Sequence, residues 1–194
     1  MAKTLDYHEN ARDYYGEVLT KSSDLRTSAC CPAQAPPVWL RQAIARLPDE
    51  ILTKFYGCGS PLPLALEGQT VLDLGCGTGR DVFTAAQFVG PSGKVIGVDL
   101  TDNQLEVARR HAPALAKEFG LPDGAIRFEK GELENLAAIG LEDNSVDVIT
   151  SNCVLNLCPD KPKAIAEIVR VLKPGGELYF SDVFASRRLS DDLR

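Results

Sequence analysis

Short apolar segments alternate with amphipathic segments over residues 69–194. Runs rich in Val, Ile and Leu predict β-strands, and the segments between them have the apolar spacing of helices. The predicted strands are 70–74, 94–100, 125–131, 145–152 and 177–184. The predicted helices are 79–89, 160–172, and one that begins after Thr101 and ends at Gly120. Repeated strand–helix–strand units predict a doubly wound α/β fold, with a mostly parallel sheet covered by helices on both faces.

The helix after Thr101 has a clear apolar face. This face consists of Leu105, Ala108, Ala112, Leu115 and Phe119. Thr101, followed three residues later by Gln104, predicts a capping box at the start of this helix.

The first sixty residues have a different pattern. Polar, turn-prone stretches separate two helical patterns, 5–18 and 37–55, and in the second of these Leu40, Ile44 and Leu47 share one face. We therefore expect an N-terminal helical extension over residues 1–60 and an α/β core over residues 61–194.

Composition narrows the class of protein. The 194 residues include 21 basic and 27 acidic ones, for a net charge of −6, which disfavours nucleic acid or an anionic membrane as a partner. No apolar run is long enough to span a bilayer, and the polar N-terminus lacks the apolar core of a signal peptide. We expect a cytoplasmic protein whose six cysteines serve thiol chemistry or simple burial rather than a disulfide framework.

The sharpest motif is VLDLGCGTGRD, residues 71–81. A predicted buried strand leads into Gly75, Gly77 and Gly79, and a helix follows, so the backbone can approach a ligand closely. The glycine spacing differs from the dinucleotide pattern G-x-G-x-x-G. Asp73 would repel a pyrophosphate but would pair with an ammonium group, which favours S-adenosyl-L-methionine as the cofactor.

Further candidates follow the next two strands. Asp99 ends the second strand, where an acid can accept hydrogen bonds from ribose hydroxyls. After the third strand, Leu133 could pack on an adenine ring and Glu134 could accept from its amino group. The combined pattern resembles the class I S-adenosylmethionine-dependent methyltransferases, and LKPGGELYFSD (172–182) is similar to a late signature of their small-molecule branch. The resemblance implies a Rossmann-like fold.

The methyl acceptor is a separate question. Oxygen and nitrogen acceptors usually need a general base, and neither His8 nor His111 is an obvious one. Cys153 follows the fourth predicted strand and Cys58 lies where the extension joins the core. On spacing alone, however, scattered cysteines are more typical of buried small side chains than of ligands. No C-x-x-C pair suggests a zinc ribbon.

The segments DLRTSACC, FYGCG, LDLGCGTGRD, SNCVLNL and VLKPGGELYFSD, in this order, resemble the arsenite methyltransferases. This resemblance implies that Cys30, Cys58 and Cys153 are thiol ligands of trivalent arsenic and serve catalysis. It also implies that Tyr56 and Asn152 line the cofactor site. Cys31 remains an alternative to Cys30, and Cys76 and Cys158 are expected to be incidental.

Soft, thiophilic arsenic suits thiolate ligands, and its lone pair can attack a sulfonium methyl group without a general base. The implied partners are trivalent arsenicals and a thiol reductant of the glutathione or thioredoxin type.

Members of that family are longer and carry a fourth cysteine beyond the point where this sequence ends. We therefore expect the last strands of the family's seven-stranded sheet to be missing, and methylation to be reduced. Two alternatives remain open: a methyltransferase for a small organic acceptor, and a non-catalytic form that only binds arsenic. Quenching of Trp39 or Tyr56 fluorescence by trivalent arsenic would distinguish arsenic binding from an organic acceptor.

Overall fold

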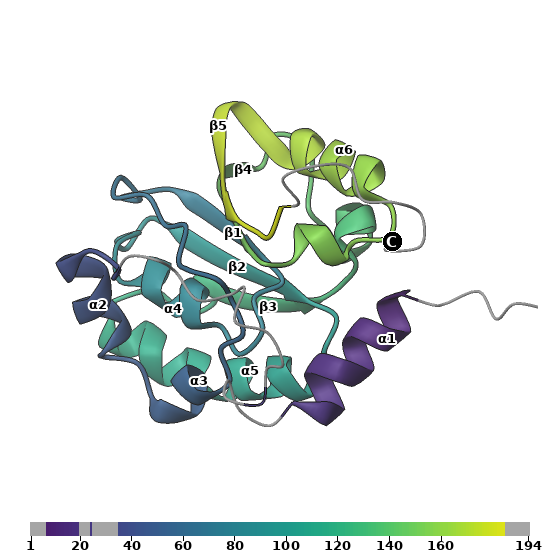
Figure 1. Cartoon of the computed structure of the whole chain (residues 1–194). Coiled ribbons are helices and arrows are strands. Elements are labelled where there is room, and N and C mark those ends of the chain that lie inside the picture. The colour runs from purple at the N-terminus through teal and green to yellow at the C-terminus, as the bar shows by residue number, and fades with distance from the viewer. Residues whose placement is uncertain (1–6, 20–23, 25–34, 185–194) are drawn as a thin grey trace, which may run out of the picture.

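Residues 7–19, 24 and 35–184 are described by the computed structural model of the chain. Their centre is a five-stranded, wholly parallel sheet of order β3-β2-β1-β4-β5 (Figure 1). The strands are β1 (Thr70–Leu74), β2 (Lys94–Asp99), β3 (Ile126–Lys130), β4 (Val146–Asn152) and β5 (Leu172–Ser181). The predicted doubly wound α/β class is confirmed.

Helices connect and flank these strands. They are α1 (Tyr7–Asp13), α2 (Val38–Ile44), α3 (Asp49–Thr53), α4 (Arg80–Ala86), α5 (Asp102–Glu118) and α6 (Lys161–Val171). A π-helical turn, Tyr14–Val18, follows α1, and two 3-10 segments, Leu133–Ile139 and Leu155–Leu157, lie between strands. Figure 1 shows α1 and α2 well apart, although both belong to the predicted extension.

The two faces of the sheet carry two separate hydrophobic cores. Val71 packs with Val82 and Leu105 of the α4–α5 side, whereas Leu72 packs with Ile168 of the α6 side. Because successive side chains of a strand point to opposite faces, a strand covered on both sides must be apolar at nearly every position. This explains the uninterrupted apolar runs in the sequence.

The helix predicted over 37–55 is divided in two. The first helix, α2, ends at Ile44, and α3 begins at Asp49, directly after Pro48. Proline has no amide hydrogen to donate and disfavours helical backbone at the preceding residue, so the two helical segments cannot be continuous there. Leu40 and Leu47 are nevertheless both buried, as the apolar pattern indicated.

The predicted capping box is wrong. Thr101 is the N-cap of α5, but its side chain makes no capping hydrogen bond. Gln104 instead donates from Nε2 to the carbonyl of Tyr15 at 2.9 Å, and Asn103 donates to the carbonyl of Gly16 at 3.2 Å. The backbone of a distant segment is the acceptor, so α5 anchors the turn that follows α1.

The last strand begins five residues earlier than predicted. Leu172 pairs with Val146 and Glu177 pairs with Val148, so residues 173–176 bulge out of the ladder. Gly175 adopts φ +82° within this bulge, a conformation that glycine reaches without strain. Within the described residues, β5 is one of the two edge strands of the sheet, and 46% of Phe180 is exposed there.

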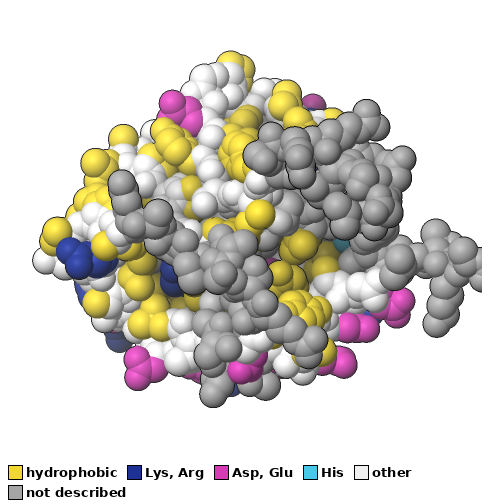
Figure 2. All heavy atoms as spheres, viewed as in Figure 1, with side chains coloured by type: hydrophobic (Ala, Val, Ile, Leu, Met, Phe, Trp, Pro, Cys, Tyr) yellow, Lys and Arg dark blue, Asp and Glu magenta, His cyan; other side chains and the backbone are white. Residues whose placement is uncertain are grey.

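None of the helices in the described segments combines the length and the apolarity needed to cross a bilayer. On the face shown in Figure 2, Lys and Arg side chains are scattered, hydrophobic side chains spread across the middle, and acidic side chains lie mainly along the lower edge.

Candidate functional site

A pocket opens where β1, β2 and β4 end. It encloses about 1000 Å³, part of it open to solvent. The chain passes from β1 to β2 on one side and reaches β4 on the other, so the pocket lies at the point where the strand order reverses. Ligands of open α/β sheets bind at such points. The predicted residues that line it are Tyr56, Asp73, Gly75, Gly77, Asp99, Leu133, Glu134, Asn152 and Cys153.

The glycine loop has the backbone conformation that only glycine adopts without strain. Gly75, Gly77 and Gly79 all have left-handed φ angles, of +69°, +54° and +88°. A Cβ atom at Gly75 would overlap the side chain of Val154, and Gly79 is the N-cap residue of α4. A side chain at Gly75 would therefore disturb the segment that carries Cys153.

Asp73 is a buried acid in the pocket wall. Its Oδ1 accepts a 2.7 Å hydrogen bond from the hydroxyl of Thr150. Burial raises the pKa of the Asp73 carboxyl well above its ordinary range, and the negative charge of Asp81 adds to this effect. A cationic group bound in the pocket would stabilise the ionised form of Asp73.

Asp99 connects the end of β2 to the glycine loop. One carboxylate oxygen accepts from the backbone N–H of Gly77 at 2.8 Å, and the other accepts from Thr101 at 2.8 Å. Burial raises the pKa of Asp99, while these backbone hydrogen bonds act in the opposite direction. Each carboxylate oxygen retains acceptor capacity toward a ligand.

Leu133 and Glu134 begin the 3-10 segment after β3, and both are buried. Glu134 Oε1 lies 3.4 Å from the N–H of Asp160, which donates to it, and 3.5 Å from Nε2 of His8. Its other oxygen, Oε2, is buried and has no hydrogen-bond partner in the described part of the chain. Because buried polar atoms are almost always paired, this acceptor fits a donor on a bound ligand.

The sequence did not indicate that α1 and the turn after it would reach the pocket. His8 and Arg12 of α1 line it, as does Tyr15 of the turn, whose ring centroid lies 5.8 Å from that of Tyr56. Burial, followed by the negative charge of Asp24, raises the pKa of the Tyr56 phenol. The signal in the sequence is the cluster of Tyr7, Tyr14 and Tyr15 within the helical pattern 5–18, which does not indicate what the helix packs against.

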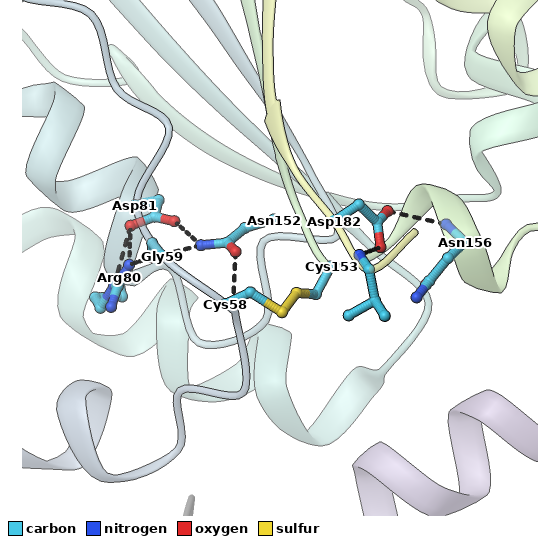
Figure 3. The surroundings of a disulfide bond; sticks show 9 residues. Cys58, Gly59, Arg80, Asp81, Asn152, Cys153, Asn156 and Asp182 are labelled. Atoms are coloured by element: carbon cyan, nitrogen blue, oxygen red, sulfur yellow. Dashed lines mark hydrogen bonds and ion pairs between the residues drawn. A yellow bond between two sulfur atoms is a disulfide. The ribbon is translucent and has the colours of Figure 1, made fainter. Parts of the chain in front are cut away.

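Cys58 and Cys153 are joined by a disulfide between segments 95 residues apart, with Cα atoms separated by 5.9 Å (Figure 3). Cys153 follows β4 directly and has a left-handed φ of +59°, which is unusual for a residue with a side chain. Its N–H donates to the carbonyl of Ser181 at 2.7 Å. Cys30 and Cys31 lie outside the described residues.

The other two described cysteines have different surroundings. Cys76 and Cys158 are buried free thiols. Burial raises the pKa of Cys76 well above its ordinary value, and burial, followed by the charge of Glu134, raises the pKa of Cys158 to about 12. Burial thus disfavours the thiolate form of both side chains, which favours the interpretation that they are incidental.

Asn152 connects the two disulfide-bonded segments. Its Oδ1 accepts from the N–H of Cys58 at 2.8 Å, and its Nδ2 donates to the carbonyl of Gly59 at 2.7 Å and to Asp81 at 3.0 Å.

Trp39, which was predicted as a fluorescence probe of arsenic binding, does not line the pocket. Its ring packs against that of Phe88, with 5.4 Å between the ring centroids. We therefore expect trivalent arsenic to quench the fluorescence of Tyr56 and not that of Trp39.

Residues 66–194 match the family of the methyltransferase domain, and the chain belongs to that family. Relatives named arsenite methyltransferase occur in Aquipseudomonas alcaligenes and Rattus norvegicus. The first is 52% identical over 187 residues, covering 96% of this chain and 54% of the relative. The second is 42% identical over 190 residues, covering 97% and 52%.

A solved structure, an arsenic(III) S-adenosylmethionine methyltransferase from Chlamydomonas reinhardtii, gives a TM-score of 0.79 at 51% identity. That match covers 82% of this chain and 53% of the other. The predicted resemblance is confirmed, and the chain spans about half the length of the relatives it matches.

Proposed function

We propose that this chain binds S-adenosyl-L-methionine and holds trivalent arsenic on cysteine thiolates beside it, so that the arsenic is methylated. One observation carries this proposal. Cys153 lines a pocket whose wall also contains Asp73, Asp99 and Glu134, and Cys58 is bonded to Cys153. Two sulfur ligands therefore lie beside the acids that suit a cationic nucleoside cofactor.

The residues present fit that cofactor. Asp73 would pair with the amino group of the cofactor, and Asp99 would accept from the ribose hydroxyls. Oε2 of Glu134, which has no partner among the described residues, would accept from the adenine amino group. Leu133 would pack on the adenine. The remaining predicted contacts are Tyr56, Gly75, Gly77, Gly79 and Asn152. When bound, the cofactor supplies an electrophilic methyl group on a cationic sulfur.

The chain's own contribution to the chemistry is to hold the acceptor. Cys58 and Cys153, once reduced, would bind arsenic as thiolates and leave its lone pair available as the nucleophile. No general base is needed, because no proton leaves the arsenic. Cys30, with Cys31 as the alternative, would be a third ligand.

The disulfide must open before arsenic can bind. Two thiols of a glutathione- or thioredoxin-type reductant would supply two electrons and two protons, releasing both cysteine thiols and forming the reductant's own disulfide. A cytoplasmic location would maintain the reduced state. In this proposal residues 1–60 contribute arsenic ligands and residues 61–194 form the cofactor-binding core.

The test is product speciation after incubation with arsenite, a thiol reductant and S-adenosylmethionine. The wild type and the matched control Cys158→Ser should yield methylated arsenic, whereas Cys153→Ser should yield none and should bind the cofactor within about twofold of wild type. Methylation of arsenic by Cys153→Ser would exclude the proposed role of Cys153, whereas a wild type that forms no methylated arsenic would direct attention to small organic acceptors. Loss of cofactor binding in Cys153→Ser would also count against it.

A further inference from the structure

We infer that Asp81 is a positioning residue for the Cys58–Cys153 pair, and that its carboxylate determines how tightly the two thiols chelate trivalent arsenic. The inference rests on the proposed function, because it concerns the same arsenic site. Asp81 was part of the glycine-loop motif but received no role from the sequence.

Asp81 is a buried hub between three segments (Figure 3). Its Oδ1 accepts from Nη2 of Arg80 at 2.7 Å and from the hydroxyl of Ser60 at 2.7 Å. Its Oδ2 accepts from Nδ2 of Asn152 at 3.0 Å. One carboxylate thus joins the start of α4, the loop after Cys58 and the end of β4.

Asp81 also determines which way the Asn152 amide points. An ionised carboxylate can only accept hydrogen bonds, and so can the carbonyl of Gly59, so Asn152 must direct its NH₂ group toward both. The amide oxygen is then left to accept from the N–H of Cys58 at 2.8 Å. Since Asn152 immediately precedes Cys153, one oriented amide controls the backbone of both cysteines.

Arg80 reinforces the same loop. Its guanidinium donates to the carbonyl of Gly59 and lies 3.2 Å from the centroid of the Phe55 ring. Asp81 provides the negative charge beside this largely buried guanidinium. Loss of that charge would leave Arg80 without its ionic partner and would release Gly59 as well as Asn152.

The distance between the sulfur atoms of Cys58 and Cys153 affects arsenic affinity, because a chelate forms in two steps. After the first thiolate has bound arsenic, the second closes the ring intramolecularly, and its effective concentration depends on the distance and orientation of the two sulfurs. A displaced loop lowers that effective concentration without changing either thiol chemically.

The experiment uses phenylarsine oxide, which condenses with two thiols and releases one water. Cys30 and Cys31 are replaced by serine in every sample, so that they cannot contribute a thiol to the bound arsenic. Asp81→Asn should weaken binding about tenfold or more, and should lower by a similar factor the equilibrium constant for disulfide formation with oxidised dithiothreitol. The matched control is Asp143→Asn, which removes a different Asp–Arg pair, of 2.7 Å, and should change both quantities by less than about twofold.

The equilibrium constant for disulfide formation distinguishes a positioning role from a general loss of stability, because it depends on how close the two thiols lie. The melting temperature of each variant is measured in parallel. Should Asp81→Asn fail to fold, Ser60→Ala removes one hydrogen bond of the hub and should reduce both quantities about twofold to fivefold. Wild-type values in a folded Asp81→Asn, or in Ser60→Ala when that is the variant used, would overturn the inference. If Cys58→Ser also binds phenylarsine oxide normally, the proposed function fails; if only the hub variant is normal, the inference alone fails.

Discussion

The four described cysteines form two contrasting pairs: Cys76, Cys153 and Cys158 line the pocket, and Cys58 is bonded to Cys153. Cys58 and Cys153 are half-buried, come from segments far apart in the sequence, and have their sulfur atoms in contact. Cys76 and Cys158 are buried, free, and held as neutral thiols by their surroundings. Proximity to the pocket is therefore not what makes a cysteine a candidate ligand: access and a partner thiol are.

The largest expected difference between the pairs is in alkylation. At pH 8 a pKa of about 12 leaves Cys158 as thiolate in roughly one molecule in 10⁴, against roughly one in four for an ordinary thiol. The higher intrinsic nucleophilicity of a more basic thiolate offsets about thirtyfold of that ratio. After reduction, Cys58 and Cys153 should react with iodoacetamide about a hundredfold faster than Cys158.

Mass spectrometry of peptides from native protein, sampled over time, measures each rate separately. Alkylation in denaturant is the control, and should make all the rates similar. Equal native rates would remove the distinction between the pairs.

A smaller effect is expected from Asp73→Asn, which alters the electrostatics near only one cysteine. In the wild type, the carboxylate of Asp73 would pair with the ammonium group of the cofactor. The variant should therefore bind S-adenosylmethionine about ten- to a hundredfold more weakly, as measured by calorimetry. The negative charge of Asp73 also contributes to the raised pKa of Cys76, so Cys76 should become easier to alkylate while Cys158 does not change.

The same variant should be the more stable protein without cofactor. The unfolded Asp73 loses its proton near pH 3.9, whereas the raised pKa keeps the folded form protonated to higher pH. Between those two pKa values the unfolded state binds fewer protons, so the free energy of unfolding falls as pH rises. The melting temperature of Asp73→Asn should therefore rise relative to that of the wild type between pH 4 and pH 7, whereas the exposed-site control Asp123→Asn should keep a constant difference from the wild type.

The smallest effect concerns backbone conformation. Cys153 has φ +59°, so under reducing conditions Cys153→Gly should be about 1 kcal/mol more stable than Cys153→Ser in urea unfolding. Cys158 has φ −64°, an ordinary value, so Cys158→Gly should be less stable than Cys158→Ser because glycine gains more freedom when unfolded. The same order of stability at both positions would show that the left-handed conformation costs little.

Much of the fold could be predicted because the hydrophobic pattern is determined by burial. Strands such as β1 are covered on both faces, and this leaves a continuous apolar run in the sequence. The errors occurred where local signals were ambiguous. The helix over 37–55 was predicted through Pro48, and the last strand was predicted to begin at residue 177 although β5 begins at Leu172 and bulges before it resumes its pairing.

The site could be predicted in part. That Asp99 lines the pocket could be predicted, because the carboxyl ends of parallel strands gather at one edge of a sheet and an acid at the end of a strand therefore has a predictable place. Asp81 was missed because an acid in the first turn of a helix is common for local reasons, while its partners Ser60 and Asn152 are 21 and 71 residues away. His8 was missed because nothing in α1 indicates that it packs near Glu134.

The reversal of strand order between β1 and β4 makes the pocket modular. The glycine loop, Asp73 and Asp99 belong to the β1–β2 half, whereas Cys153 belongs to the β4 half. Side chains beyond the end of β4 can therefore change during evolution, altering which acceptor is recognised, without breaking the hydrogen bonds that hold the glycine loop to Asp99. Val154 is the exception, because its contact with Gly75 requires the two halves to evolve together.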